Sequence, residues 1–218
     1  MVERNHKTNK HKHIVIVDNT VNTSSKSEDN IKNARFLHML ISYLKTVRPD
    51  DTFIRVSTLK ELKAHEAMAD RIVMSGSSKD IPDLRDKDER YRMGKYIVEQ
   101  CCSKKKYPPV LGICFGAQLL NDILEGSLKK LPKMMCTTRM VDFAYNNCKH
   151  CVQFCLHFLP LKLGTGLKAT ATMSTNPFKD LPVAFEHDRL SIMGTLFHPE
   201  AREETYPILS SFFEKGTL

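Results

Sequence analysis

The chain has 218 residues, of which 41% are hydrophobic and 27% charged, and its formal net charge is +8. This length favours one globular domain with a substantial core and leaves no room for a second catalytic domain. The composition excludes a disordered or fibrous chain. The longest aliphatic runs, such as residues 14–17, fall far short of the roughly 20 apolar residues that cross a bilayer, so we expect no membrane span.

The N-terminal segment is rich in basic residues and has no apolar stretch of the kind that a secretory signal needs. We predict a basic, disordered leader over residues 1–12 and one domain over residues 13–218. No aromatic residue interleaves the leader's charges to stack on bases, so we do not expect nucleic acid as a partner. Seven cysteines, an odd count in a chain of this size, are typical of free thiols in a reducing compartment, which predicts a cytoplasmic location.

The first half of the chain alternates between short aliphatic runs and amphipathic segments, which predicts strands alternating with helices. The predicted strands cover residues 13–18, 52–56, 71–74 and 109–113, and the predicted helices cover residues 31–44, 59–68 and 89–102. Such alternation is typical of βαβ units, which form a parallel sheet with helices on both faces.

The second half has a different texture, because short stretches of alternating apolar and polar residues replace the long amphipathic segments. These stretches lie at residues 151–154, 169–172 and 182–185. We interpret the whole of residues 131–198 as antiparallel strands added to one edge of the same sheet. An apolar strand within residues 190–197 and a helix over residues 203–214 complete the chain. The predicted fold class is therefore α/β, with a mainly parallel sheet, helices on both faces and antiparallel edge strands.

The most informative segment surrounds Cys114. A buried strand leads to Gly112, Cys114 lies at the turn, Gly116 lets the backbone fold back, and residues 117–124 are predicted to be helical. This is the strand–turn–helix setting of a nucleophile elbow, with Cys in the place of Ser. A thiol at a helix N-terminus feels the positive end of the helix dipole, which favours the nucleophilic thiolate. On these residues alone, a buried structural cysteine on a tight turn remains an equal alternative.

A thiol nucleophile needs a base, and the base needs a group that orients it. His198-Pro199-Glu200 follows an apolar strand near the C-terminus. In an extended or turn segment His198 and Glu200 can point to the same side, so that the carboxylate accepts from one ring nitrogen while the other faces Cys114. Pro199 biases His198 away from helical geometry. We hypothesise a catalytic triad of Cys114, His198 and Glu200.

These segments resemble class I, or triad-type, glutamine amidotransferase domains. The similarity lies in the elbow 112–118, the Phe-His-Pro-Glu segment 197–200, and the stretches 72–77, 126–132 and 183–187, and it spans about residues 13–216. The resemblance implies a flavodoxin-like α/β fold and a glutamine-hydrolysing enzyme.

The resemblance also implies a mechanism. Cys114 would attack the side-chain amide carbon of L-glutamine, and His198, held by Glu200, would protonate the departing ammonia and then activate water to hydrolyse the thioester. Backbone N–H groups at Gly76 and Ser77 and at Phe115 would stabilise the oxyanion. Gln118, in the first turn of the elbow helix, would help to hold the substrate.

The loop 76–78 departs from the family pattern of two glycines followed by proline, because it reads Gly-Ser-Ser. Ser77 still offers an N–H group, although its φ range is narrower than that of glycine. The loop and the elbow resemble a GMP-synthase-like or γ-glutamyl-peptidase-like subgroup. Three hypotheses remain open: an ammonia donor to a separate synthase, a stand-alone γ-glutamyl hydrolase or peptidase, and a catalytically weak amidotransferase-like binding protein.

A metal site and a nucleotide site are the competing signals. Cys148, Cys151, Cys155 and His157 have a zinc-like spacing. The alternation around Phe154 indicates a strand, however, and four residues of strand separate Cys151 from Cys155 by about 13 Å, too far for both to bind one zinc ion. No phosphate-binding loop motif is present, so ATP use would require a separate synthase. We expect neither a metal nor a cofactor.

Overall fold

The computed structural model describes residues 11–20, 28–77, 81, 88–144 and 148–217. Most of the predicted leader lies outside these residues, so its disorder stays a prediction. The backbone of Lys12 is already joined to the sheet, because its N–H donates to a carboxylate oxygen of Asp51 at 3.0 Å and its carbonyl accepts from Thr52 at 2.9 Å. Ordered pairing of the described chain thus begins at least one residue before the first strand.

One nine-stranded sheet runs through the described residues, in the order β2-β1-β3-β4-β9-β8-β7-β5-β6. The strands are β1 (His13–Val17), β2 (Thr52–Val56), β3 (Arg71–Met74), β4 (Val110–Ile113), β5 (Ser127–Phe143), β6 (Cys148–Lys162), β7 (Leu167–Met173), β8 (Pro182–His187) and β9 (Ile192–Thr195). The pairs from β2 to β9 are parallel, and those from β9 to β6 are antiparallel. The predicted architecture is confirmed, with an antiparallel part as extensive as the parallel one. One expectation within it is wrong: β9 lies in the stretch 131–198 that was predicted to be antiparallel, yet it pairs in parallel with β4.

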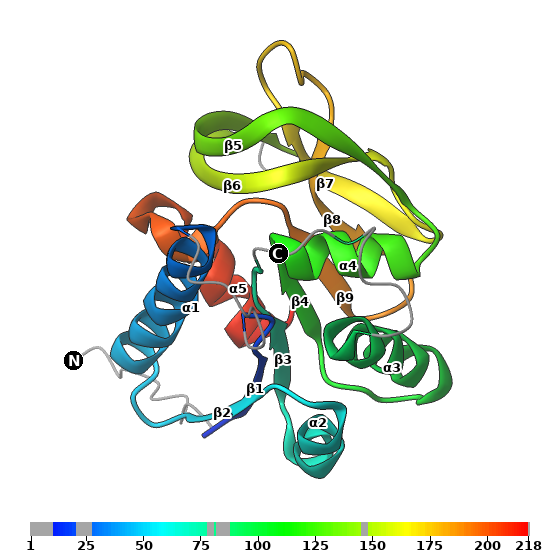
Figure 1. Ribbon diagram of the computed structural model, residues 1–218. Helices are drawn as coiled ribbons and strands as arrows, with labels where there is room; N and C mark the ends of the chain where they lie inside the picture. The colour runs from blue at the N-terminus through cyan, green and yellow to red at the C-terminus, as the bar shows by residue number, and fades with distance from the viewer. Residues whose placement is uncertain (1–10, 21–27, 78–80, 82–87, 145–147, 218) are drawn as a thin grey trace, which may run out of the picture.

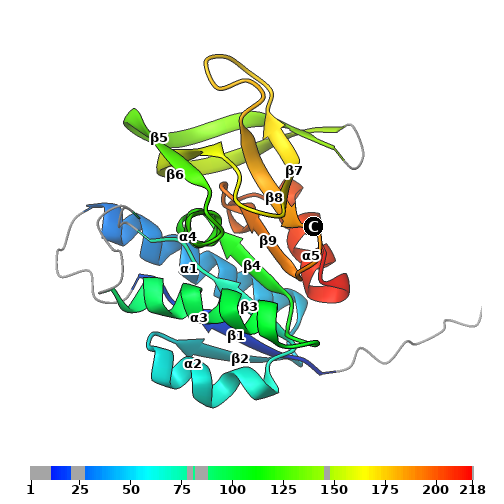
Figure 2. The ribbon, with the colours of Figure 1, turned by 90° about the vertical axis from the view of Figure 1, so that its right-hand side faces the viewer.

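Helices cover both faces of the parallel strands (Figures 1 and 2). On one face lie α1 (Glu28–Val47) and α5 (Tyr206–Lys215), and on the other lie α2 (Leu59–His65), α3 (Glu89–Ser103) and α4 (Phe115–Ile123). Short 3-10 turns add η1 (Glu66–Met68), η3 (Pro199–Ala201) and η4 (Glu203–Thr205). Among the described helices, none combines the length and the apolar character that crossing a membrane would need.

The core lies between these layers. Residues 14–17 of β1 are almost completely buried, as are residues 72–74 of β3. Strands covered on both faces need apolar side chains at every position, which is why they appear in the sequence as unbroken aliphatic runs. Burial of these strands places their carboxyl ends, and therefore Cys114 at the end of β4, at one edge of a rigid platform.

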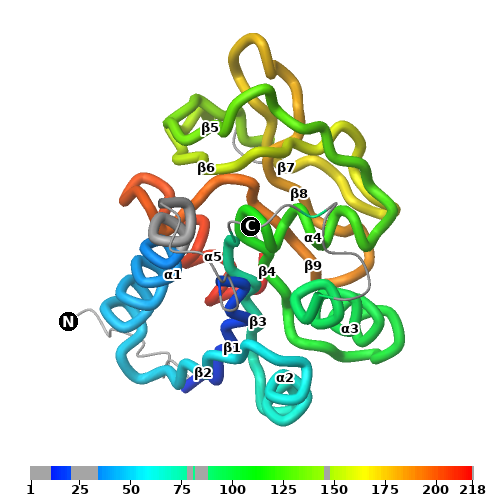
Figure 3. Tube along the Cα trace, in the orientation of Figure 1, coloured from blue at the N-terminus to red at the C-terminus, as the bar shows by residue number. Residues whose placement is uncertain are grey.

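Two local expectations differ from the structure. β5 and β6 have 17 and 15 residues, whereas the sequence indicated only short strands there. Register shifts and Pro132 interrupt the regular alternation in β5, which hides its length. In the Cα trace this long pair lies at the end of the molecule opposite β2 and α2 (Figure 3). The elbow helix also begins two residues earlier than predicted, at Phe115, because Cys114 alone makes the turn.

Candidate active site

The turn at Cys114 is strained. Its φ of 53° and ψ of −106° lie outside the regions that L-residues favour, and such a conformation costs about 1–3 kcal/mol. The surroundings enforce it: the Cys114 N–H donates to the carbonyl of Thr195 at 2.7 Å. A Cβ atom on Gly116 would lie 2.4 Å from the Met74 carbonyl oxygen, and one on Gly112 would lie 2.6 Å from the backbone nitrogen of Ala117. Both elbow glycines are therefore required by close backbone packing.

Strand pairing brings the histidine to the cysteine. β4 and β9 are parallel neighbours with Ile113 opposite Thr195, so His198 lies three residues beyond the strand that pairs with the cysteine's own. The backbone N–H of His198 donates to the carbonyl of Gln153 on β6 at 2.8 Å. Two residues further on, a Glu200 carboxylate oxygen lies 2.8 Å from His198 Nδ1. The imidazole is completely buried and Glu200 is 3% exposed, so their charges interact with little screening by solvent.

The environment of His198 favours the protonated ring. Burial lowers its pKa, but the negative charge of Glu200 and the nearby Cys114 raise it more, and the net effect raises the pKa of His198 to about 10. Nδ1 is engaged with Glu200, while Nε2 has no hydrogen bond of regular geometry to any described residue. Instead, the Cys114 thiol points to the carbonyl of Cys155, with an Sγ–O distance of 3.4 Å. An imidazolium beside a thiol is an arrangement that supports nucleophilic attack.

An aromatic side chain from α1 covers the imidazole. Phe36 stacks on His198, with ring centroids 3.7 Å apart and an interplanar angle of 16°. Cys114 is itself only 2% exposed. The reactive groups are thus enclosed, which removes competing water from the thiol and the ring.

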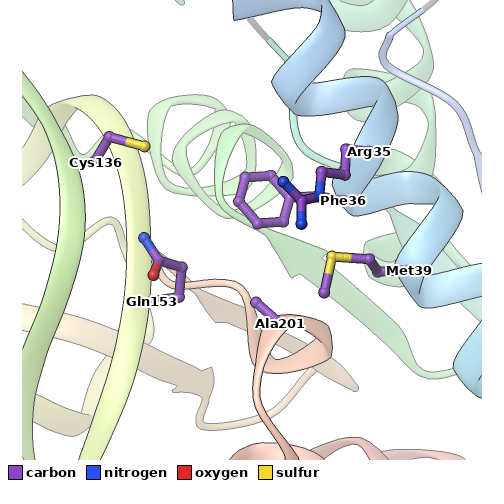
Figure 4. A pocket seen from close by; sticks show the side chains of 6 residues that line it. All are labelled: Arg35, Phe36, Met39, Cys136, Gln153 and Ala201. Carbon is purple, nitrogen blue, oxygen red and sulfur yellow. The ribbon is translucent and has the colours of Figure 1, made fainter.

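Phe36 also lines a cavity of about 310 Å³. It is formed by side chains from α1, β5, β6 and η3, which Figure 4 shows around a common space. They are Arg35, Phe36, Met39, Cys136, Gln153 and Ala201. Phe36 therefore contacts both the cavity and His198. The guanidinium group of Arg35 supplies hydrogen-bond donors to this space (Figure 4). The side-chain nitrogen of Gln153 already donates to the carbonyl of Phe154 at 2.7 Å.

The loop after β3 carries the predicted oxyanion donors Gly76 and Ser77, and both are buried. Asn19 fixes the start of this loop, because its side chain donates to the Ser75 carbonyl at 2.7 Å and its N–H donates to the Ser75 hydroxyl at 3.0 Å. The buried guanidinium of Arg90 donates to the Ser77 hydroxyl at 3.2 Å.

Arg90 also connects the loop to the elbow. Its guanidinium lies over the Phe115 ring, 5.9 Å from the centroid, and pairs with Asp88 at 2.5 Å. The N–H of Phe115 begins α4, where the first N–H groups of a helix have no acceptor within it. The guanidinium of Arg90 therefore contacts both segments that are predicted to supply oxyanion donors, the loop at Ser77 and the start of α4 at Phe115.

The Gln118 side chain joins two parts of the fold. Its side-chain nitrogen donates to the carbonyl of Phe158 on β6 at 2.8 Å, and the residue is 4% exposed. This bond joins the elbow helix to the antiparallel part of the sheet. A role in holding substrate stays a prediction for this residue.

The four residues with zinc-like spacing do not converge. β6 is a strand throughout Cys148–Lys162, and within the described residues no group of three or more possible metal ligands occurs. Cys155 faces Cys136 on the adjacent strand instead.

Sequence reasoning missed Phe36, Arg90 and Cys155 as neighbours of the site. Phe36 and Arg90 occupy ordinary positions in amphipathic helices, and nothing in their spacing marks them. The weak signal at Cys155 was its place in a strand rich in cysteine, which indicated a metal rather than a contact with Cys114.

The fold and the site together define an α/β protein with a cysteine on a nucleophile elbow and a His–Glu pair beside it. The family model for class I glutamine amidotransferases matches residues 29–215. The chain therefore belongs to the class I glutamine amidotransferase family, as the motifs predicted.

Solved structures with the same fold are distant in sequence. A candidate GMP synthase component from Thermoplasma acidophilum is 20% identical with a TM-score of 0.67, over 93% of this chain and 92% of that one. A glutamine amidotransferase from Thermotoga maritima is 14% identical with a TM-score of 0.62, over 94% of this chain and 84% of that one. One from Methylobacillus flagellatus is 13% identical with a TM-score of 0.54, over 93% and 75%. No curated protein sequence gives a significant match.

Proposed function

We propose that the chain is a glutaminase that hydrolyses the side-chain amide of L-glutamine through a Cys114 thioester and releases ammonia to a separate synthase. The observation that carries this proposal is the joint placement of a strained elbow cysteine and a buried His198–Glu200 pair. Membership of the amidotransferase family supports the choice of glutamine. Likeness to a candidate GMP synthase component supports a synthase as the ammonia acceptor.

The proposed chemistry follows from the charge state of the site. Transfer of the Cys114 proton to Nε2 of His198 gives a thiolate beside an imidazolium. The thiolate attacks the amide carbon, and the oxyanion accepts hydrogen bonds from backbone N–H groups at Phe115 and at the loop of Gly76 and Ser77. His198, whose raised pKa keeps the ring protonated at neutral pH, gives a proton to the departing ammonia. The neutral ring then takes a proton from water, which attacks the thioester and yields glutamate.

Substrate entry requires a local movement, because Cys114 is 2% exposed and His198 is completely covered. The side chain of Phe36 is the group in position to move, since it touches both His198 and the adjacent cavity. Rotation of one side chain is a small change, and it would let Nε2 face the substrate's nitrogen.

The test is release of ammonia and glutamate from glutamine by the wild type and by Cys114→Ala. We expect the variant to lose at least about a thousandfold in rate. Cys102→Ala is the matched control, because Cys102 is an exposed free thiol on α3, and it should keep full activity. Equal rates for the wild type and Cys114→Ala would end the enzymatic proposal and leave a binding protein.

The cavity favours a second candidate function, hydrolysis of γ-glutamyl amides with larger leaving groups. Ammonia needs almost no space, whereas about 310 Å³ lies beside the residue that covers His198, the group that would protonate the leaving amine. Arg35 would pair with a carboxylate on that amine, as at the C-terminus of a γ-glutamyl peptide.

A comparison of substrates separates the two candidates. If the cavity holds the leaving group, Arg35→Gln should raise KM for a γ-glutamyl dipeptide by about tenfold, the loss of one charge-assisted hydrogen bond, and leave KM for glutamine unchanged. Arg35→Lys should restore part of the affinity. A wild type that hydrolyses glutamine and no γ-glutamyl peptide would exclude this second function.

A further inference from the structure

Two cysteines on adjacent strands lie beside the candidate site, and the proposed reaction uses neither side chain. Cys136 on β5 is directly opposite Cys155 on β6 in the antiparallel register, and their sulfur atoms are 2.9 Å apart. Opposed residues of this kind have Cβ atoms about 4.5–5.5 Å apart, close to the separation that a disulfide spans. The strand pairing therefore holds two thiols at a distance from which they can join.

The two thiols differ in exposure. Cys136 is exposed and Cys155 is buried, whereas Cys114 is only 2% exposed. Figure 4 shows the Cys136 side chain at the wall of the cavity. A small oxidant that arrives from solvent or through the cavity meets Cys136 before it meets Cys114.

The pair is also connected to the nucleophile. The Cys155 carbonyl accepts the hydrogen bond of the Cys114 thiol at 3.4 Å, while the Cys155 sulfur contacts Cys136. One residue of β6 thus lies between an exposed thiol and the buried reactive one.

We propose that Cys136 and Cys155 form a reversible oxidation site that takes up a peroxide before Cys114 is oxidised. The Cys136 thiolate attacks hydrogen peroxide, so that an S–O bond forms, the O–O bond breaks and hydroxide leaves, which takes up the proton that the thiol released and becomes water. The Cys155 thiolate then attacks the sulfenic sulfur, the S–O bond breaks, and a second water leaves. Two thiols lose two electrons and one peroxide gains them. An excess of a small thiol such as dithiothreitol reverses the reaction by exchange.

A second thiol close by protects the first, because it converts the sulfenic acid to a disulfide quickly. A lone sulfenic acid persists and is oxidised further to products that thiols do not reduce. Here the second sulfur is already within 2.9 Å of the first, so ring closure needs no change of fold and the product stays reversible.

The experiment uses the full, reduced protein and hydrogen peroxide at increasing ratios. Remaining thiols are alkylated after denaturation, and the peptides are mapped by mass spectrometry. We expect a Cys136–Cys155 cross-linked peptide as the main product at low peroxide, its loss on treatment with dithiothreitol, and an unoxidised Cys114. Cys102→Ser changes an exposed thiol elsewhere and should behave like the wild type.

The decisive variant is Cys136→Ser, which alters an exposed side chain and should leave the fold intact. It removes the cross-link, and we expect Cys114 to be oxidised at a peroxide ratio at least severalfold lower than in the wild type. Accumulation of irreversible acids at Cys136 without a cross-link would overturn the proposal, as would oxidation of Cys114 at the same ratio in both proteins. Because the readout is peptide mass, it does not depend on the proposed glutaminase activity.

Discussion

Replacing Glu200 with glutamine should destabilise the protein in a pH-dependent manner. Glu200→Gln keeps the side chain's shape and an oxygen that can accept from His198 Nδ1, but it removes the negative charge. That charge is the largest cause that raises the pKa of His198, so the pKa should fall well toward its ordinary value once the charge is gone, while burial continues to lower it.

The magnitude follows from linkage. The pKa of His198 is about 10 in the folded protein, and its ordinary value of 6.5 applies to the unfolded chain. This difference corresponds to a contribution of at most about 5 kcal/mol to the free energy of unfolding. The observed loss should be smaller, about 3 kcal/mol at pH 6.5, because the ring can lose its proton in the variant and avoid an unpaired buried charge.

The sign of the pH dependence is also determined. A folded-state pKa raised above the unfolded value stabilises the protein fully below pH 6.5, and this contribution is lost as pH rises through 10. The difference in unfolding free energy between the wild type and Glu200→Gln should therefore shrink by up to about 1.4 kcal/mol per pH unit over this window. Groups that do not interact with His198 or Glu200 titrate equally in both proteins and cancel.

Urea unfolding of both proteins between pH 6.5 and 10 measures this difference. Glu203→Gln is the matched control, since Glu203 is exposed on η4, and it should change stability little at any pH. Glutamine hydrolysis at neutral pH should fall about a hundredfold or more in Glu200→Gln. A stability difference that stays constant from pH 6.5 to 10 would refute the charge coupling between Glu200 and His198.

Two further substitutions test how the elbow and the loop are held. Arg90→Met removes the donor to Ser77 and leaves Asp88 without this cation, so unfolding free energy should fall by about 2–4 kcal/mol and kcat by about tenfold or more. Arg92→Met, at an exposed pair, is its control, and an unchanged kcat for Arg90→Met would contradict the loop's assigned role. Gly116→Ala places a Cβ 2.4 Å from the Met74 carbonyl and should cost at least about 2 kcal/mol in thermal unfolding. Gly94→Ala meets only side-chain atoms, of Ile123 and Leu119 and at 2.9 Å or more, and a larger loss there than at Gly116 would argue against the backbone packing described.

The parallel half of the fold could be predicted because its signals are local. An unbroken aliphatic run such as residues 14–17 is required wherever helices cover both faces of a strand, and the structure buries it fully. The contact between His198 and Glu200 could be predicted for the same reason, since only Pro199 separates them. Their catalytic roles, and that of Cys114, stay predictions until the variants are measured.

Tertiary structure alone decided what surrounds these residues. The sequence near Cys114 gives no indication that the Cys155 carbonyl accepts from its thiol, or that Phe36 covers its base, because these contacts join segments 41 residues apart or more. Strand register sets the first contact, and the packing of α1 against η3 sets the second. The lengths of β5 and β6 were hidden likewise, since pairing across a register shift stabilises residues whose own pattern is irregular. Local chemistry thus pointed to Cys114 as the predicted nucleophile and to His198 as its predicted base, whereas the register of the sheet determined how these residues are enclosed.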